Sequence, residues 1–151
     1  MRFRATSIFG LTLALLLATT SGRAQGSAPS EYQIKAAFLF NFAKFVEWPP
    51  KAFAEKASPF IIGVLGQNPF GSDLEQTIRG KTVNARPLQV KEFHSVTEAT
   101  NCHILFISTS EKDRLPEIFD GLRDSRVLTV GGTDLFTETG GMIYFVPEGH
   151  K

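Results

Sequence analysis

The chain has 151 residues, which is enough for one domain with a hydrophobic core and too few for two ordinary domains. Its first 24 residues contain three arginines and no acidic residue, so 13 of the 16 basic residues remain against 15 acidic ones, a net charge of −2. A slightly acidic protein gains little from counterion release on a phosphate backbone, and we therefore expect no nucleic-acid partner. Cys102 is the single cysteine. An intramolecular disulfide is thus excluded, while an intermolecular one in an oxidising compartment stays open.

The first 24 residues have the pattern of a secretory signal peptide. Arg2 and Arg4 precede the apolar stretch "IFGLTLALLLA", and small residues follow in "SGRAQ". A basic N-terminal region, a short apolar segment and small residues at the cleavage site predict export with cleavage near Ala24. The alternative is an uncleaved N-terminal anchor, for which the apolar run is short. We expect residues 25–30 to form a flexible lead.

The first element expected after this lead is an aromatic helix. Ser30 can cap it, and Pro49 and Pro50 must end it because proline cannot continue a helix. At about 100° per residue, one broad face collects the large apolar residues, with Leu39 and Trp48 at its margins: Ile34, Phe38, Phe42, Phe45 and Val46. We expect this face to pack into the core.

Phe40 does not belong to this face. It falls among Gln33, Lys44 and Glu47, where the helix should meet water. A single exposed Phe is ordinary, but this one adjoins a helix already rich in aromatic residues. We therefore predict a partner contact at Phe40, Lys44 and Glu47.

Strands and helices are expected to alternate along the rest of the chain. Apolar runs bounded by glycine or polar residues predict buried strands at 60–66, 103–108 and 126–132, and weaker signals predict strands at 85–93 and 140–147. Pro87 places the strand at 85–93 nearer a sheet edge. Helical patterns fall within 68–80 and after Ser108, where Ser108 and Glu111, or Ser110 and Asp113, have capping-box spacing. This order predicts one α/β domain with a mostly parallel sheet flanked by helices.

Catalytic signatures are scarce. His94, His103 and His150 lack the spacing of a helical zinc site, and His103 opens an apolar strand, which favours core packing. No nucleophile elbow, phosphate loop or dinucleotide fingerprint occurs. We expect a protein that is not an enzyme and uses no metal or cofactor. An uncharacterised hydrolase is the weakest alternative, because no nucleophile–base pair is visible.

Polar residues follow three of the predicted strands. Ligands of parallel sheets bind beyond the carboxyl ends of strands, beside helix N-termini. This position makes seven residues candidates for a ligand crevice: Gln67, Asn68, Ser108, Ser110, Glu111, Thr133 and Asp134. The competing interpretation, that these residues cap helices and form turns, is favoured by their types.

Four stretches in order, "IKAAFLFNFAKFVEWP", "IIGVLGQNPFG", "CHILFISTSE" and "VLTVGGTDLFTETGGMIYFV", are similar to the YfiR-like periplasmic proteins. The similarity covers the chain from about Tyr32 to Phe145, the expected domain being residues 31–151. It implies a Rossmann-like α/β domain, dimeric and exported, without enzymatic activity. The resemblance further implies repression of a membrane-bound diguanylate cyclase of the YfiN type through its periplasmic portion, and hence control of cyclic di-GMP and biofilm formation.

Two features depart from the family pattern. Members commonly have one or two disulfides, which Cys102 alone cannot form within the chain. The pattern also continues into a final strand and a C-terminal helix, and this chain stops at Lys151. We therefore expect the last strand and helix to be missing, with sheet edge and core surface exposed. The alternative function is an extracytoplasmic receptor for a small molecule, suggested by the polar strand ends.

Overall fold

A computed structural model describes residues 27–146. The predicted signal peptide and residues 147–151 lie outside the described part of the chain. The fold is built around a six-stranded sheet in the order β2-β3-β1-β4-β5-β6. The strands are β1 (Phe60–Leu65), β2 (Thr82–Val83), β3 (Arg86–Phe93), β4 (Ile104–Ile107), β5 (Leu128–Gly131) and β6 (Ile143–Tyr144).

Every pairing in the sheet is parallel except that of β2 with β3, which is antiparallel. From β1 the chain goes to the edge strand β2, returns to β3 beside β1, and then crosses to β4 on the other side of β1. The strand order therefore reverses between β1 and β4, the position at which doubly wound sheets bind their ligands. Among residues 27–146, β2 and β6 each have a neighbouring strand on one side only and form the edges of the sheet as described.

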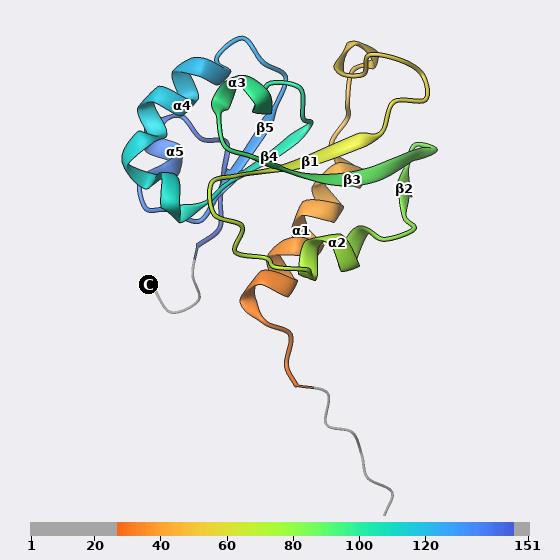
Figure 1. The fold of residues 1–151 in the computed structure, drawn as a ribbon, viewed down its shortest axis with the longest axis horizontal. Helices are drawn as coiled ribbons and strands as arrows, with labels where there is room; N and C mark the ends of the chain where they lie inside the picture. The colour runs from red at the N-terminus through yellow and green to blue at the C-terminus, as the bar shows by residue number, and fades with distance from the viewer. Residues whose placement is uncertain (1–26, 147–151) are drawn as a thin grey trace, which may run out of the picture.

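Helices cover both faces of the sheet (Figure 1). α1 and α2 lie against one face, and α3, α4 and α5 lie against the other. The α-helices are α1 (Glu31–Phe45), α2 (Asp73–Ile78), α3 (Val96–Ala99), α4 (Leu115–Leu122) and α5 (Phe136–Thr139), and two 3-10 turns are η1 (Pro50–Ala52) and η2 (Thr109–Arg114). The protein is thus an α/β domain of three layers, as the sequence predicts.

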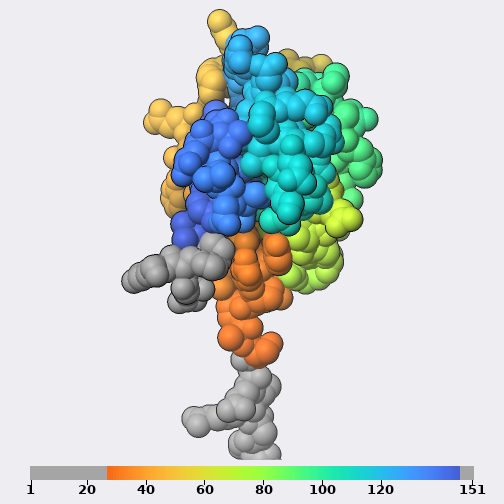
Figure 2. All heavy atoms as spheres, turned by 90° about the vertical axis from the view of Figure 1, so that its left-hand side faces the viewer, coloured from red at the N-terminus to blue at the C-terminus, as the bar shows by residue number. Residues whose placement is uncertain are grey.

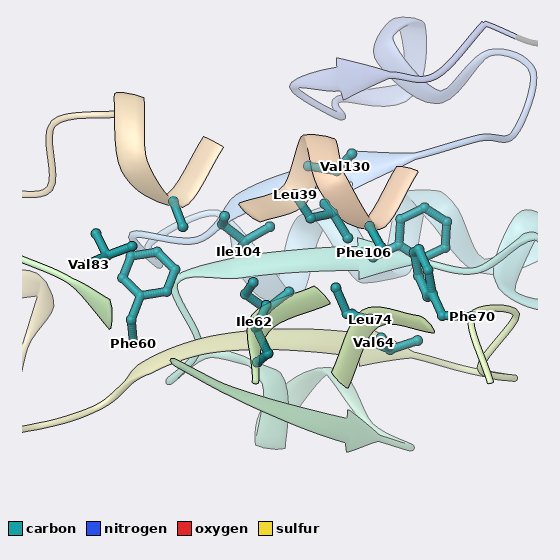
Figure 3. Packing of buried hydrophobic residues seen from close by; sticks show 13 residues of the cluster. Leu39, Phe60, Ile62, Val64, Phe70, Leu74, Val83, Ile104, Phe106 and Val130 are labelled. Atoms are coloured by element: carbon teal, nitrogen blue, oxygen red, sulfur yellow. The ribbon is translucent and has the colours of Figure 1, made fainter. Parts of the chain in front are cut away.

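Two hydrophobic cores form because side chains of a strand alternate between its faces. Ile62 and Val64 of β1, with Phe106 of β4, point toward α1 and α2, where they meet Leu39 and Leu74 (Figure 3). The alternate residues, among them Leu65, Leu105 and Ile107, pack against α3, α4 and α5. The three strands predicted to be apolar on both faces, β1, β4 and β5, are inner strands with a parallel neighbour on each side.

The two weaker strand predictions, at 85–93 and 140–147, are also confirmed, since each segment contains a strand. β3 lies one strand from the edge, and its Pro87 is opposite Thr82 of the two-residue edge strand β2. β6 is shorter than the predicted 140–147. Three short elements escape the sequence analysis, namely β2, α3 and α5, because each is too short to establish a hydrophobic period.

Candidate functional site

The N-terminus of α1 is fixed by a complete capping box. The hydroxyl of Ser30 accepts a hydrogen bond from the backbone N–H of Gln33, and the Gln33 side chain accepts one from the backbone N–H of Ser30. The helix ends at Phe45, and Val46 leaves it in an extended conformation. Ser30 thus caps the helix as predicted, and the helix ends before the two prolines.

The face that α1 turns to the sheet consists of one leucine and two alanines. Ala36, Leu39 and Ala43 are fully buried, at positions i, i+3 and i+7. Two alanines allow the helix backbone to lie close to the strands. The signal for this face was present in the sequence, but a helical wheel weighted by large apolar side chains overlooks alanine.

The predicted core face of α1 is therefore wrong for three of its residues. Ile34, Phe38 and Phe45 are 45%, 48% and 76% exposed. Phe42 and Val46 are partly buried, and Phe42 packs against the core as predicted. The physical reason is that α1 is apolar on nearly all sides, so the largest residues do not identify the side that packs against the sheet. Figure 2 shows α1 atoms, in orange, at the surface below the α5 region.

Phe40 lies on the flank of α1 that the sequence predicts to be wet, but its ring is partly covered. It is partly buried and packs against the core cluster beneath α1 and α2. Two ammonium groups lie over its ring, the Lys81 Nζ at 4.4 Å from the centroid and the Lys44 Nζ at 5.5 Å. Lys44 and Glu47 are exposed. The predicted outward orientation of Phe40 is thus wrong. Lys44 lies beside its ring, as the sequence indicates, whereas the approach of Lys81 is a feature that the sequence did not indicate.

A second aromatic cluster joins α1 to the C-terminal strand. The ring of Phe145 lies 6.0 Å from that of Phe38 and 6.2 Å from that of Phe42. Lys35 is buried beside this cluster, where it pairs with Glu31 and places its Nζ 4.8 Å from the Tyr32 ring centroid. A buried lysine next to aromatic faces and a carboxylate is a satisfied cation. The sequence pattern does not indicate the burial of this lysine.

At the point where the strand order reverses, the predicted crevice residues contact one another. The backbone N–H of Gln67, after β1, donates to the Ser110 hydroxyl, after β4, at 3.0 Å. The Ser110 hydroxyl in turn donates to Glu111, whose carboxylate pairs with Arg114. Ser108 accepts from the Ser110 backbone N–H and caps η2. Of the two predicted capping boxes, neither forms with its glutamate or aspartate side chain, and Ser108 alone acts as a cap.

Two of the three remaining crevice candidates, Asn68 and Asp134, have hydrogen-bond partners of their own. Asn68 accepts from the backbone N–H of Phe70, as in an Asx turn, and donates to Glu92 at 2.6 Å. Asp134, after β5, accepts from the Tyr144 hydroxyl at 2.8 Å, and this hydrogen bond raises the pKa of Tyr144. The Thr133 hydroxyl is buried without a partner. Turn and cap formation thus accounts for most of these side chains, and their role in ligand binding stays a prediction.

An open groove of about 740 Å³ lies at the opposite end of the sheet, where β1, β4 and β5 begin. Lys51 and Arg126 line it together with Asp120 and Asp124, so its charges are mixed. His103 and Cys102 border it but are both buried. Burial lowers the pKa of His103, and it raises the pKa of the Cys102 thiol to about 12.

His103 packs as a core residue. Its ring stacks on Phe53 and on Phe60, with centroid distances of 4.5 and 4.6 Å. Both ring nitrogens are within hydrogen-bond distance of backbone atoms, those of Ile61 and Ala52. Among residues 27–146 no cluster of three or more potential metal ligands occurs. In the same part of the chain no helix is long and apolar enough to cross a membrane.

The described residues thus form one α/β domain, and several large apolar side chains of α1 are exposed on it. The chain belongs to the YfiR/HmsC-like family, whose sequence pattern matches residues 32–151. No curated protein matches the chain. Membership implies a regulatory role of the YfiR type, in a family of generally non-catalytic proteins.

Proposed function

We propose that the protein is a periplasmic regulator that binds the periplasmic portion of a membrane diguanylate cyclase and restrains cyclic di-GMP synthesis. Export by the signal peptide, homodimer formation and an effect on biofilm formation belong to the same proposal. The observation that carries it is the family match over residues 32–151, which includes every described helix and strand but the first residue of α1.

The surface around Phe40 supports a contact with a protein partner. Lys44 and Lys81 are exposed, come from different segments of the chain and have their ammonium groups over one aromatic ring. A cationic rim beside a partly buried ring resembles the aromatic and basic composition of protein interfaces. We propose that Phe40, Lys44 and Glu47 contact the cyclase, with Lys81 completing the surface. An acidic segment of the partner would be complementary to the two lysines.

Capture from membranes tests this proposal. The mature protein serves as bait for detergent-solubilised membranes of the source organism, and captured proteins are identified by mass spectrometry. We expect enrichment of a membrane protein with a cytoplasmic diguanylate cyclase domain. The double variant Lys44→Glu/Lys81→Glu should lose at least tenfold in recovery while it keeps the melting temperature of the wild type, because it alters exposed charges.

A matched control reverses two exposed charges elsewhere. Lys56 and Lys112 are both exposed, and neither lies over an aromatic ring among the described residues. The variant Lys56→Glu/Lys112→Glu has the same net charge as the test variant and should retain capture. Equal loss in both variants would show a dependence on net charge and reject the proposed surface. Failure to capture any cyclase with the wild type would reject the proposed partner.

A further inference from the structure

The segment that joins α1 to β1 has little regular structure of its own. Residues 49–59, called the strap from here on, contain the 3-10 turn η1 and no α-helix or strand. Every residue of the strap is at least partly exposed. Figure 1 shows it as the gold loop that projects beyond the start of β1. A segment with few buried apolar contacts opens at a low free-energy cost, so its position depends on the few contacts that hold it.

The first of these contacts comes from Arg86 of β3. Its Nη1 donates to the carbonyls of Glu55 and Ser58 at 2.9 and 2.8 Å. Its Cζ also lies 3.8 Å from the centroid of the Phe53 ring, as in a cation–π contact. Arg86 thus binds the second half of the strap.

The second contact comes from His103, which directly precedes β4. Its ring stacks on that of Phe53 and places Nε2 3.0 Å from the Ala52 carbonyl. The backbone of His103 is fixed within the sheet, because its N–H donates to the Ile61 carbonyl and its carbonyl accepts from the Leu128 N–H. A change in the ring therefore acts on the strap and leaves the backbone of the strand in place.

The neutral ring fits this position and the protonated ring does not. Nδ1 accepts a hydrogen bond from the backbone N–H of Ile61, so Nε2 carries the proton and faces the Ala52 carbonyl. A protonated ring would turn a second N–H toward the N–H of Ile61, and it can avoid this contact only by moving. Burial lowers the pKa of His103, and the charge of Arg86 acts in the same direction.

The surroundings offer the protonated ring no acidic partner at hydrogen-bond distance. Among residues 27–146 both ring nitrogens of His103 are engaged by backbone atoms. The groove beside the ring has titratable and charged groups from η1, β3, α4 and the segments before β4 and β5, and these are Lys51, Lys91, Cys102, Asp120, Asp124 and Arg126. Asp120 pairs with Arg123, and burial raises the pKa of Cys102 to about 12, which keeps its thiol neutral.

We propose that the strap is an acid-sensitive latch, which neutral His103 holds against the end of the sheet and protonated His103 releases while the sheet stays folded. Lys51, Phe53 and Ser58 of the strap form one wall of the groove of about 740 Å³. Release of the strap therefore opens this wall, and the acidity around the protein determines whether the groove is open. The inference does not depend on the proposed cyclase partner.

Hydrogen–deuterium exchange across a pH series tests the latch. Within the strap, the backbone N–H groups of Ala52, Phe53 and Ser58 have carbonyl acceptors that also belong to the strap. Exchange rates of the mature protein are measured from about pH 7.5 down to about pH 4.5 and divided by the intrinsic rate at each pH. Below pH 6.5 we expect the protection of the strap to fall about tenfold, while β4 and α4 keep theirs.

Three variants assign this fall to His103. His103→Gln is neutral at every pH and can still donate to the Ala52 carbonyl, so its strap should stay protected throughout the series. His103→Phe has no donor, so its strap should exchange faster than that of the wild type at neutral pH and show no pH-dependent fall. His94→Gln is the matched control, because His94 is an exposed histidine after β3, and it should behave as the wild type does.

The wild-type series carries the test even if a variant of His103 does not fold. A loss of protection confined to the strap supports the latch. No loss in the wild type, or a loss spread evenly over the strap, β4 and α4, overturns it. A fall of wild-type size in a folded His103→Gln or His103→Phe protein also overturns it, since another group would then control the strap.

Discussion

The Nδ1 atom of His103 accepts a hydrogen bond from the backbone N–H of Ile61 at 3.0 Å. Because Nδ1 accepts, the neutral ring carries its proton on Nε2, which can donate to the Ala52 carbonyl. The imidazole therefore links β1 to η1 in its neutral form only. Protonation would convert Nδ1 into a donor that faces another donor, and Arg86 nearby adds charge repulsion.

This contact predicts a pH dependence of stability. Burial lowers the pKa of His103 in the folded state below the ordinary value of 6.5, so the unfolded chain binds more protons between the two pKa values. The contribution of His103 to the free energy of unfolding is fully present above pH 6.5, and it is lost as the pH falls through the folded-state pKa. We expect the melting temperature of the wild type to fall over this window more than that of His103→Phe. The Phe variant retains ring stacking but has no titrating ring at this position.

Parallel melts at several pH values between about 5 and 7.5 compare the two proteins in the window around the ordinary His pKa. Carboxylates and the other histidines contribute equally to both curves, so their difference isolates residue 103. His103→Phe should be less stable at all pH values, because the Ile61 N–H loses its acceptor. Two parallel curves would show that His103 does not titrate in this range.

The Cys102 thiol should be nearly inert in the native protein. Its Sγ donates to the Ala99 carbonyl at 3.1 Å, and burial raises its pKa to about 12. The reactive species is the thiolate, which is therefore rare at neutral pH. We expect a chromogenic disulfide reagent at pH 8 to react at least about a hundredfold more slowly with the native protein than with the denatured chain. Comparable rates would place the thiol at the surface, where Cys102 could form an intermolecular disulfide.

Adjacent residues of α1 should differ sharply in their effect on stability. Leu39 is fully buried and Phe38 is half-exposed. Leu39→Ala should cost about 2–5 kcal/mol of unfolding free energy, as large-to-small changes in a core do. Phe38→Ala should cost less than about 1 kcal/mol in the monomer, since it loses only partial contacts with Phe42 and Phe145.

Chemical denaturation at concentrations below the dimer dissociation constant measures both values without a contribution from association. A larger loss for Phe38→Ala than for Leu39→Ala would restore the orientation of α1 that the helical wheel predicts.

The contrast between the strands and α1 shows what the sequence can specify. Strands such as β1 and β4 are apolar on both faces, so both faces are expected to be buried. Their central position in the sheet can therefore be predicted from the sequence. α1 is also apolar on most sides, but a helix that covers a sheet packs only one of its sides against the strands. Which side packs is determined by the close approach of Ala36 and Ala43 to the strands, which is a property of the packed structure.

The candidate sites show the same limit. The sequence places Gln67 and Ser110 after neighbouring parallel strands, and the structure brings them together as expected. The sequence cannot show that the Gln67 backbone N–H and the Ser110 hydroxyl form a direct hydrogen bond with each other. The pairing of Lys81 with Phe40 escapes the sequence analysis for another reason: the two residues are distant in the chain and meet only through the packing of α1 on α2.

The concentration of cyclic di-GMP in the source organism tests the account most directly. It is measured by mass spectrometry in the wild type, in a deletion of the gene, and in the deletion complemented either by the full chain or by a form without residues 1–24. If the protein restrains a cyclase from the periplasm, we expect the cyclic di-GMP concentration to rise on deletion. The full chain should restore the wild-type concentration, and the form without residues 1–24 should not. An unchanged concentration on deletion, or full restoration by the form without residues 1–24, would contradict the account.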